Sequence, residues 1–262
     1  MDLHLSGQRV LVTGASRGIG LAIVRAFEAE GAEVVAVSRH STPELEATGA
    51  VFVAADLSAP DGPRRMVETV LAADPRLDVL VNNAGGGSGN EAAFTDPLEG
   101  SDDDWAQVFA LNLNGAVRTT RAALPALIAA RGAIVNISSD SARRPGASPL
   151  PYASAKAALN AFSRGLAEKV AAQGVRINVV TPSGTRTSLL ESADGFGAQL
   201  AGALGIDHDE LLKTMPEQSG MLTGELIDPA EIARTVLLLA SPTMPSVIGA
   251  NWAVDAGAIK IV

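Results

Sequence analysis

The chain contains one tyrosine, Tyr152, and one of its four lysines, Lys156, follows four residues later. Residues four apart lie on the same face of a helix, so the phenol and the ammonium would be neighbours. Ser138 and Ser139 precede them at the end of an apolar run. Reduction of a ketone requires a hydride for the carbon and a proton for the oxygen, and a phenol beside an ammonium can supply that proton.

An ammonium close to Tyr152 would make the phenol more acidic. A phenol pKa near 10 must fall to about 7 for efficient proton exchange, which takes roughly 4 kcal/mol. One charge at about 4 Å, in an effective dielectric of about 20, supplies roughly 4 kcal/mol. We therefore expect one lysine to be sufficient, and an oxidised nicotinamide would add to its effect.

A glycine-rich loop, residues 13–20 (TGASRGIG), follows the first apolar run. Gly14 would form the tight turn out of a strand, Gly18 would let the backbone approach a pyrophosphate, and Gly20 would allow close helix packing. The N-terminus of the helix that follows offers N–H groups and partial positive charge to phosphates. The loop therefore predicts a dinucleotide site, and a purely structural turn is the alternative.

The end of the second apolar run indicates which dinucleotide is bound. An acidic residue there would accept the ribose 2′-hydroxyl of NAD, whereas this chain has Ser38 followed by Arg39. A guanidinium can bind a 2′-phosphate with two hydrogen bonds, and Arg17 offers a second cation. We expect NADP(H); the alternative is that Arg39 is an ordinary surface arginine.

Short apolar runs alternate with longer helical patterns along the chain. The runs are Arg9–Thr13, Glu33–Val37, Val51–Ala54, Asp78–Val81, Ala133–Ser138, Arg176–Val180 and Asn251–Val254. The helices are expected at about 18–30, 61–73, 102–130, 152–173 and 228–240. This alternation predicts one α/β domain over residues 1–262, with a Rossmann-like doubly wound sheet of about seven parallel strands and helices on both faces.

Two segments interrupt this alternation. Residues 85–100 are rich in glycine and are expected to form a mobile loop. Residues 183–225 contain two short helical stretches between glycines, and within them we expect a helical lid over the substrate at about 188–224. An ordinary helical insertion is the alternative.

Composition excludes several functional classes. The 262 residues carry a net charge of −9 without a basic stretch, which argues against nucleic acid and anionic membranes as partners. The chain has no cysteine, and its three histidines are scattered, so we expect no metal centre. The longest apolar stretch is far shorter than a membrane span, and a cytoplasmic location is expected.

Further motifs occur in a consistent order: Asp56-Leu57, Asn82–Gly85, Asn112, IVNISS at 134–139, YASAK at 152–156, the Pro182…Thr187 stretch and VDAG at 254–257. With these motifs spread over nearly its whole length, the chain resembles the short-chain dehydrogenase/reductase family, in its single-domain form. The resemblance implies an enzyme that interconverts a ketone or aldehyde and an alcohol by hydride transfer.

The resemblance also implies roles for individual residues. Tyr152 would be the general acid/base, and Lys156 would lower its pKa and bind the nicotinamide ribose. Ser139 would bind the substrate oxygen. Asn112, in a helix that the family bends at this point, would hold a water that links Lys156 to solvent. The expected cofactor-binding residues are Gly14, Ser16, Arg17, Gly18, Ile19, Gly20, Ser38, Arg39, Asp56, Leu57, Asn83, Ala84, Gly85, Tyr152, Lys156, Pro182, Thr185 and Thr187.

Some of these residues have simpler alternative roles. Ser139 could only cap the end of its strand, Asn112 could be an ordinary helix residue, and Asp56 could start the next helix. The family usually has Pro-Gly where this chain has Pro182-Ser183-Gly184, which makes Thr185 an uncertain contact.

The substrate is expected to be small to medium in size and mainly apolar, because the lid is rich in Leu, Ala, Phe196, Met215 and Met221, with its acidic residues facing water. Arg143 and Arg144 could attract a substrate anion, or they could lie in a solvated turn. A homotetramer is expected, formed through the helices at about 102–130 and 152–173, and the apolar end Ile259–Val262 suits a subunit contact.

Three other functions stay open. They are a 3-oxoacyl thioester reductase, a catalytically silent NADP-binding sensor, and an epimerase or dehydratase of nucleotide sugars. The turns at 130–132 and 172–174 contain only one arginine, which argues against an acidic carrier protein as partner. The length of the chain leaves little room for the C-terminal substrate domain of the sugar enzymes.

Overall fold

The computed structural model describes residues 1–87 and 100–260. Its strands form one seven-stranded sheet in the order β3-β2-β1-β4-β5-β6-β7, and all neighbouring strands are parallel. They are β1 (Arg9–Thr13), β2 (Glu33–Ser38), β3 (Val51–Ala54), β4 (Val79–Asn82), β5 (Ala133–Ile137), β6 (Arg176–Pro182) and β7 (Asn251–Val254). The predicted doubly wound sheet is confirmed.

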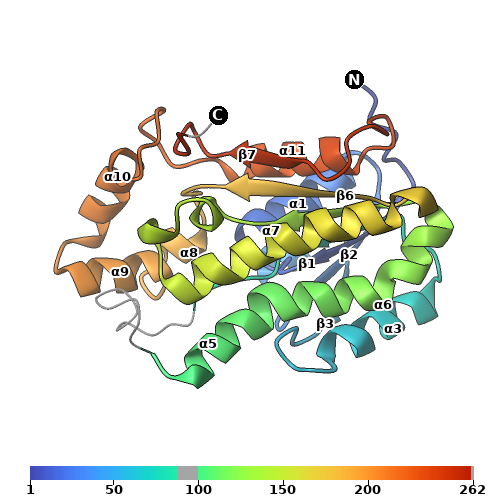
Figure 1. The fold of residues 1–262 in the computed structure, drawn as a ribbon, viewed down its shortest axis with the longest axis horizontal. Coiled ribbons are helices and arrows are strands. Elements are labelled where there is room, and N and C mark those ends of the chain that lie inside the picture. Colours follow the sequence, from blue (N-terminus) through green and yellow to red (C-terminus); the bar gives the residue numbers. More distant parts are fainter. Residues whose placement is uncertain (88–99, 261–262) are drawn as a thin grey trace.

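Helices cover both faces of the sheet (Figure 1). They are α1 (Gly18–Ala29), α2 (Pro43–Glu46), α3 (Gly62–Ala73), α5 (Asp102–Phe109), α6 (Gly115–Ala130), α7 (Leu150–Val170), α8 (Ser188–Glu191), α9 (Phe196–Leu204), α10 (His208–Gln218) and α11 (Pro229–Ala240). In the view of Figure 1, α3, α6 and α7 lie in front of the sheet, and α1 and α11 lie behind it.

The inner strands are apolar on both sides because each face has its own core. Val10 and Val12 of β1 pack with α1 and α11, whereas Leu11 between them packs with α3, α6 and α7. Successive side chains of a strand point to opposite faces, so a strand buried on both faces reads as a continuous apolar run. This explains why the apolar runs locate the strands to within two residues.

The long helix expected at 102–130 is interrupted. The structure has α5, then a π turn over Ala110–Asn114, and then α6. The helix expected at 152–173 begins earlier, at Leu150, and ends in a 3-10 turn over Ala171–Gln173. The short helix α2, which is capped by Thr42, has no counterpart among the predictions.

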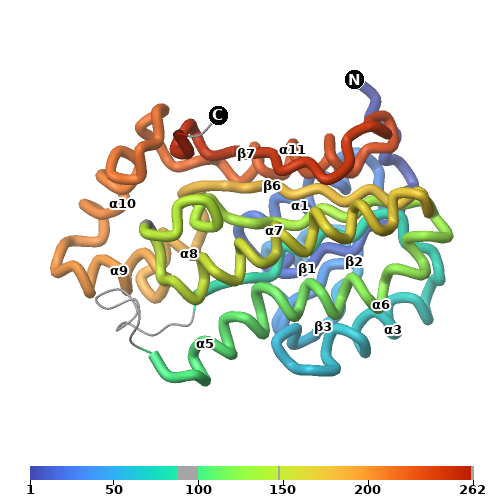
Figure 2. Tube along the Cα trace, viewed as in Figure 1, coloured from blue at the N-terminus to red at the C-terminus, as the bar shows by residue number. Residues whose placement is uncertain are grey.

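Residues 188–224, called the lid segment from here on, contain three helices where two helical stretches were predicted. Figure 2 traces the chain from the end of β6 through α8, α9 and α10 and back to α11. The predicted loop at 85–100 lies largely outside the described residues, as do the last two residues of the chain. Among the described residues, no helix combines the length and apolarity needed to cross a membrane.

Candidate active site

Nearly all of the predicted site residues lie at one edge of the sheet. The strands are parallel, so the loops that follow β1, β2, β4, β5 and β6 all leave at their carboxyl ends. The chain reverses its direction of winding between β1 and β4, which are neighbours in the sheet. In open α/β sheets, ligands bind outside the carboxyl ends at such a switch point.

The glycine loop is packed so closely that side chains would not fit at its three glycines. Gly14 has φ +64°, and a Cβ there would lie 2.8 Å from Ala84 Cα. A Cβ on Gly20 would lie 2.1 Å from Gly14 O, and one on Gly18 would lie 3.1 Å from Thr187 Cγ2. Gly14 and Gly20 therefore allow the loop to pack against the loop after β4 and α1 to pack against the loop, which leaves the N-terminus of α1, where a phosphate is favoured, directly behind the loop.

Hydrogen bonds hold the loops after β1 and β4 together. The Thr13 hydroxyl accepts from the N–H groups of Asn83 and Ala84, at 3.0 and 3.1 Å. The Asn83 amide in turn donates to Thr13 O and Gly14 O. Thr13 was not among the predicted site residues, although its place between a strand and the first glycine is a usable signal. The side chain of Asn83 positions the glycine loop.

The cations expected at the adenosine end are exposed. Ala15 N donates to Val37 O at 3.0 Å, which brings the glycine loop to the end of β2. Ser38 donates to His40 O, so no carboxylate stands at the end of this strand. Within residues 1–87 and 100–260, no hydrogen bond or ion pair engages the guanidinium of Arg17 or Arg39. Both groups are exposed, and the Asp56 carboxyl lies near enough to Arg39 for their charges to interact.

Asp56 does not start a helix. Helix α3 has Asp61 at its N-cap, whereas Asp56 accepts hydrogen bonds from the backbone and hydroxyl of Ser58. These hydrogen bonds, and then the charge of Arg39, lower the pKa of the Asp56 carboxyl, while partial burial opposes them. The alternative of a helix-initiating role is thus wrong, and Leu57 beside it is buried.

Lys156 is buried below Tyr152 on α7. Its ammonium donates to Ile137 O at 3.0 Å and lies 5.7 Å from the centroid of the Tyr152 ring. Burial lowers the pKa of Lys156 to about 8. The ammonium therefore keeps most of its charge at neutral pH, and it lies against the aromatic ring as the i, i+4 spacing predicted.

Burial raises the pKa of Tyr152 to about 12; a hydrogen bond with Ser139 lowers it, and the Asp140 charge adds to the increase. A fall from about 12 to about 7 takes roughly 7 kcal/mol. One charge at the ring-centroid distance supplies about 3 kcal/mol in an effective dielectric of about 20. The expectation that one lysine is sufficient took no account of this desolvation, and it stays a prediction.

Asn112 lies inside the π turn and is buried. Its amide donates to Val108 O at 2.9 Å and to Gly86 O at 2.8 Å, and its Oδ1 accepts from Gly86 N. A Cβ on Gly85 would lie 2.7 Å from Asn112 Oδ1 and 3.0 Å from Lys156 Nζ. Asn112 is thus no ordinary helix residue, since the turn brings it to the loop after β4, and Gly85 leaves space beside Lys156.

Ser139 both caps a turn and contacts Tyr152. Its hydroxyl accepts from Ser141 N at 3.2 Å, which caps the 3-10 turn Asp140–Ala142, and it lies near enough to Tyr152 to lower the pKa of that phenol. The neighbouring Ser138 is buried, and its hydroxyl faces Lys156 O. Capping and contact with Tyr152 are therefore not exclusive alternatives for Ser139.

The stretch after β6 lies beside the glycine loop. Pro182 is the last residue of β6, and Thr187 packs against Gly18. The Thr185 hydroxyl donates to Ser183 O at 2.8 Å, and the Ser183 hydroxyl donates to Asp140 Oδ2 at 2.8 Å. The serine that replaces the usual glycine thus has a specific partner in the loop after β5.

Comparison with known proteins identifies the family. Residues 8–195 match the short chain dehydrogenase family model. The chain belongs to the short-chain dehydrogenase family. Its membership agrees with the sheet order and with the cluster of Ser139, Tyr152 and Lys156 at the carboxyl edge.

Similar proteins are oxidoreductases. The chain is 34% identical over 270 residues to the uncharacterized oxidoreductase YvrD of Bacillus subtilis (strain 168), covering 99% of each protein. It is 34% identical over 264 residues to galactitol 2-dehydrogenase (L-tagatose-forming) of Cereibacter sphaeroides, covering 97% of this chain and 96% of that protein. Its fold is similar to that of L-sorbose reductase from Gluconobacter frateurii complexed with NADPH and L-sorbose, with a TM-score of 0.88, 31% identity and full coverage of both chains. As a short-chain dehydrogenase, the chain is an oxidoreductase.

Apolar side chains of the lid segment lie near the active-site loops of this short-chain dehydrogenase. A Cβ on Gly87 would meet the Phe196 ring at 3.9 Å. One on Gly184 would meet the sulfur atoms of Met221 and Met215, at 3.5 and 4.0 Å. The acidic residues of the lid segment are exposed, as predicted: Glu191, Asp194, Asp207, Asp209, Glu210 and Glu217.

Arg143 and Arg144 do not lie in a solvated turn. Arg143 donates to Asn251 O, and Arg144 donates to Ser219 O and Ala258 O. Both side chains are half-buried and bind carbonyl oxygens of the chain itself. The solvated turn is therefore wrong, because the pair connects the loop after β5 to β7 and to the end of the lid segment, and the attraction of a substrate anion stays a prediction.

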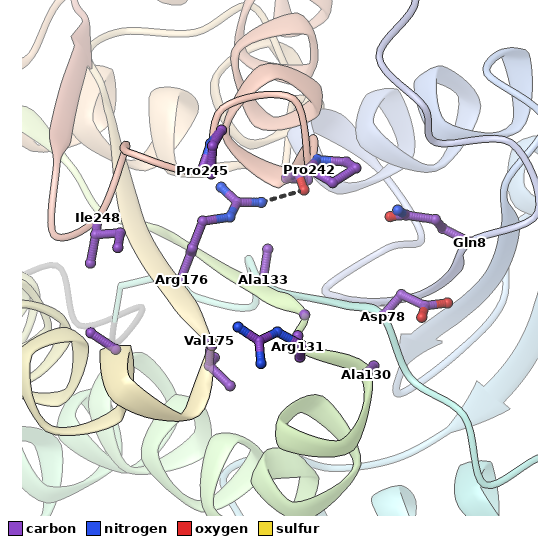
Figure 3. A pocket seen from close by; sticks show the side chains of 14 residues that line it. Gln8, Asp78, Ala130, Arg131, Ala133, Val175, Arg176, Pro242, Pro245 and Ile248 are labelled. Atoms are coloured by element: carbon purple, nitrogen blue, oxygen red, sulfur yellow. Dashed lines mark hydrogen bonds between the residues drawn. The ribbon is translucent and has the colours of Figure 1, made fainter.

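A pocket of about 350 Å³ opens at the opposite edge of the sheet (Figure 3). It is lined by Asp78, Ala133 and Arg176, which stand where strands begin, and by Arg131. The Arg176 guanidinium is bound to the carbonyls of Leu239, Ala240 and Ser241 at the end of α11. The pocket is therefore separate from the site that contains Tyr152.

Proposed function

We propose that the chain is an NADP(H)-dependent oxidoreductase that interconverts a ketone or aldehyde and an alcohol, with Tyr152 as the general acid/base. The observation that carries the proposal is the meeting of Ser139, Tyr152 and Lys156 beside the glycine loop. A sensor that only binds a nucleotide has no need of these three residues.

The residues present fit a dinucleotide with a 2′-phosphate. Gly18 would let the backbone approach the pyrophosphate at the N-terminus of α1, while Gly14 and Gly20 allow the turn and the close helix packing that position it. Arg17 and Arg39 would bind the 2′-phosphate, and Ser38 offers no carboxylate that would repel it. The similar L-sorbose reductase holds NADPH, which supports this choice. When bound, NADPH supplies the hydride for the substrate carbon.

The remaining steps belong to the side chains of the protein. Ser139 would hold the carbonyl oxygen, and Tyr152 would transfer its phenolic proton to that oxygen as the carbonyl becomes an alcohol. Lys156 would stabilise the phenolate that is left behind. Asn112, which lies beside Gly85 and close to Lys156, would help to return a proton from solvent. In the oxidation of an alcohol, Tyr152 would accept the proton instead.

A small to medium, mainly apolar substrate agrees with Phe196, Met215 and Met221 near the active-site loops. L-sorbose and galactitol, named for two similar proteins, are instead polyhydroxylated. The substrate panel therefore has to contain both an apolar ketone and a ketose.

The test is the loss of NADPH absorbance with aliphatic and aromatic ketones, L-sorbose and a 3-oxoacyl thioester, using the wild type and Tyr152→Phe. We expect turnover of an apolar ketone and a loss of about a hundred- to ten-thousandfold in the variant, the range of general acid catalysis. Tight binding of NADPH without turnover of any substrate would favour the silent sensor.

The proposal includes a homotetramer formed through α5–α6 and α7, on the basis of the family resemblance. Light scattering of the purified chain tests it. A mass of four chains supports the proposal, and a monomer contradicts it.

A further inference from the structure

The Asp140 carboxylate connects the loops that follow β5 and β6. Its Oδ2 accepts from the Ser183 hydroxyl at 2.8 Å and lies 3.8 Å from Arg144 Nη1. Its Oδ1 lies 3.2 Å from the Ser139 hydroxyl, which can donate either to it or to the Ser141 hydroxyl at 3.0 Å. The side chain is 16% exposed, so one largely buried carboxylate contacts the serine of the site and two anchoring groups.

Both anchors of Asp140 are themselves fixed. Arg144 donates to Ser219 O, at the end of α10, and to Ala258 O near the end of the chain. The Ser183 N–H donates to Val254 O at the end of β7, and its carbonyl accepts from the Thr185 hydroxyl. The position of the carboxylate is therefore set from three segments that lie far apart in the sequence.

We propose that Asp140 is a positioning residue that, fixed by Ser183 and Arg144, orients the Ser139 hydroxyl and holds a negative charge beside Tyr152. This inference rests on the proposed function and adds a residue to it. Ser183 contributes to this arrangement because the glycine that is usual at this position would leave Asp140 Oδ2 without its closest hydrogen-bond donor.

The charge of Asp140 acts against ionisation of Tyr152. The Asp140 charge and burial both raise the pKa of the phenol, and the Ser139 hydrogen bond lowers it. A fixed carboxylate would thus keep Tyr152 protonated, which is the form that donates a proton to a carbonyl. By opposing the loss of the phenolic proton, Asp140 would delay formation of the phenolate, and with it alcohol oxidation, to a higher pH.

Other charges near α7 are remote or already bound. Three elements packed against α7 carry charged residues: the 3-10 turn with Asp140, followed by Arg143 and Arg144; α5 with Asp102, Asp103 and Asp104; and β6 with Arg176. Helix α7 itself carries Lys156, Arg164, Glu168 and Lys169. The α5 aspartates lie in its first turn, Arg164 pairs with Glu168, and Arg176 starts β6. Asp140 is therefore the charge that acts on Tyr152 in the unliganded chain, because Lys156, with a pKa of about 8, is largely neutral at the pH where the phenol titrates.

The test is a phenolate titration of the unliganded chain by ultraviolet difference absorbance, which reports Tyr152 alone because the chain has one tyrosine. We expect Asp140→Asn to lower the midpoint by about one pH unit or more, as for removal of a like charge. Asp74→Asn removes the same charge near Arg9, at the opposite edge of the sheet, and should leave the midpoint unchanged.

An unchanged midpoint in folded Asp140→Asn would overturn the proposal. Asp140→Ser, which also lacks the charge, carries the same prediction if Asp140→Asn does not fold. Failure of both variants to fold would show a purely structural role and would also overturn it. The titration does not depend on turnover. If Asp140→Asn shifts the midpoint but the wild type reduces no carbonyl, the proposed function is refuted and the role of Asp140 beside Tyr152 is not.

Turnover measurements test the part played by Ser183. We expect Ser183→Ala to lower kcat about tenfold with little change in the KM for NADPH, because only the support of Ser139 is lost. In the double variant Ser183→Ala/Asp140→Asn, the decrease in kcat should be smaller than the product of the decreases in the two single variants, because both substitutions break the same hydrogen bond. Independent effects would contradict the coupling.

Discussion

Tyr152 lies in a site where desolvation and charge act on its phenol in opposite directions. Burial holds its pKa at about 12, while Lys156, 5.7 Å from the ring centroid, favours the phenolate. The lysine supplies less than half of the roughly 7 kcal/mol needed for a pKa near 7. The positive charge of an oxidised nicotinamide is therefore the natural source of the remainder.

At the same scale, Arg39 should determine the cofactor preference. We expect Arg39→Asp to lower kcat/KM for NADPH by about ten- to hundredfold and to raise it for NADH, because a charge-assisted hydrogen bond contributes about 1.5–3 kcal/mol. Initial rates with both cofactors check this. The matched control is Arg234→Asp, the same change at an exposed residue of α11. Equal effects of the two variants would mean that Arg39 is an ordinary surface arginine.

At the scale of elements, the close packing of α1 against the glycine loop depends on Gly20. A Cβ there would lie 2.1 Å from Gly14 O, so the loop or the helix must move. We expect Gly20→Ala to lower the free energy of unfolding by about 1–3 kcal/mol, as for overpacking, and to weaken NADPH binding. Denaturant unfolding and fluorescence titration with NADPH measure the two effects.

Gly202→Ala is the matched control for this prediction. Gly202 lies in α9, and a methyl group added there would meet nothing within 4 Å, so alanine should stabilise the helix by about 0.5–1 kcal/mol. If both substitutions had the same effect, the close approach at Gly20 would have no energetic consequence.

The bounds of the strands were predicted well because they depend on a local pattern, the run of apolar residues. The strands of the sheet are continuous apolar runs, and β1, β3 and β7 have the predicted bounds. The π turn around Asn112 could not be predicted in this way, because the Asn112 side chain reaches Gly86, which is remote in sequence. The same holds for Asp140 and Ser183, whose hydrogen bond spans 43 residues between two loops.

At the scale of the whole molecule, the buried Lys156 links stability to pH. Its pKa is about 8 in the folded chain and 10.5 as its ordinary value. Between these values the unfolded chain binds more protons than the folded chain, so the free energy of unfolding rises with pH. Below pH 8 the buried charge destabilises the fold in full, and above 10.5 that cost disappears.

The prediction concerns the difference between wild type and Lys156→Met, in which other titrations cancel. From about pH 7 to about pH 10, the stability of the wild type relative to the variant should increase by about 2 kcal/mol. Denaturant unfolding at several pH values measures it, with circular dichroism to verify that the variant folds. A difference independent of pH would show that Lys156 is not desolvated.

The most direct test of the central claim is the phenolate titration of Tyr152 with and without saturating NADP⁺. If Tyr152 transfers the proton beside the cofactor, bound NADP⁺ should lower the midpoint by several pH units from about 12, and Lys156→Met should reduce that decrease. A midpoint that stays the same when NADP⁺ is shown to be bound would contradict the assignment of Tyr152 as the general acid/base.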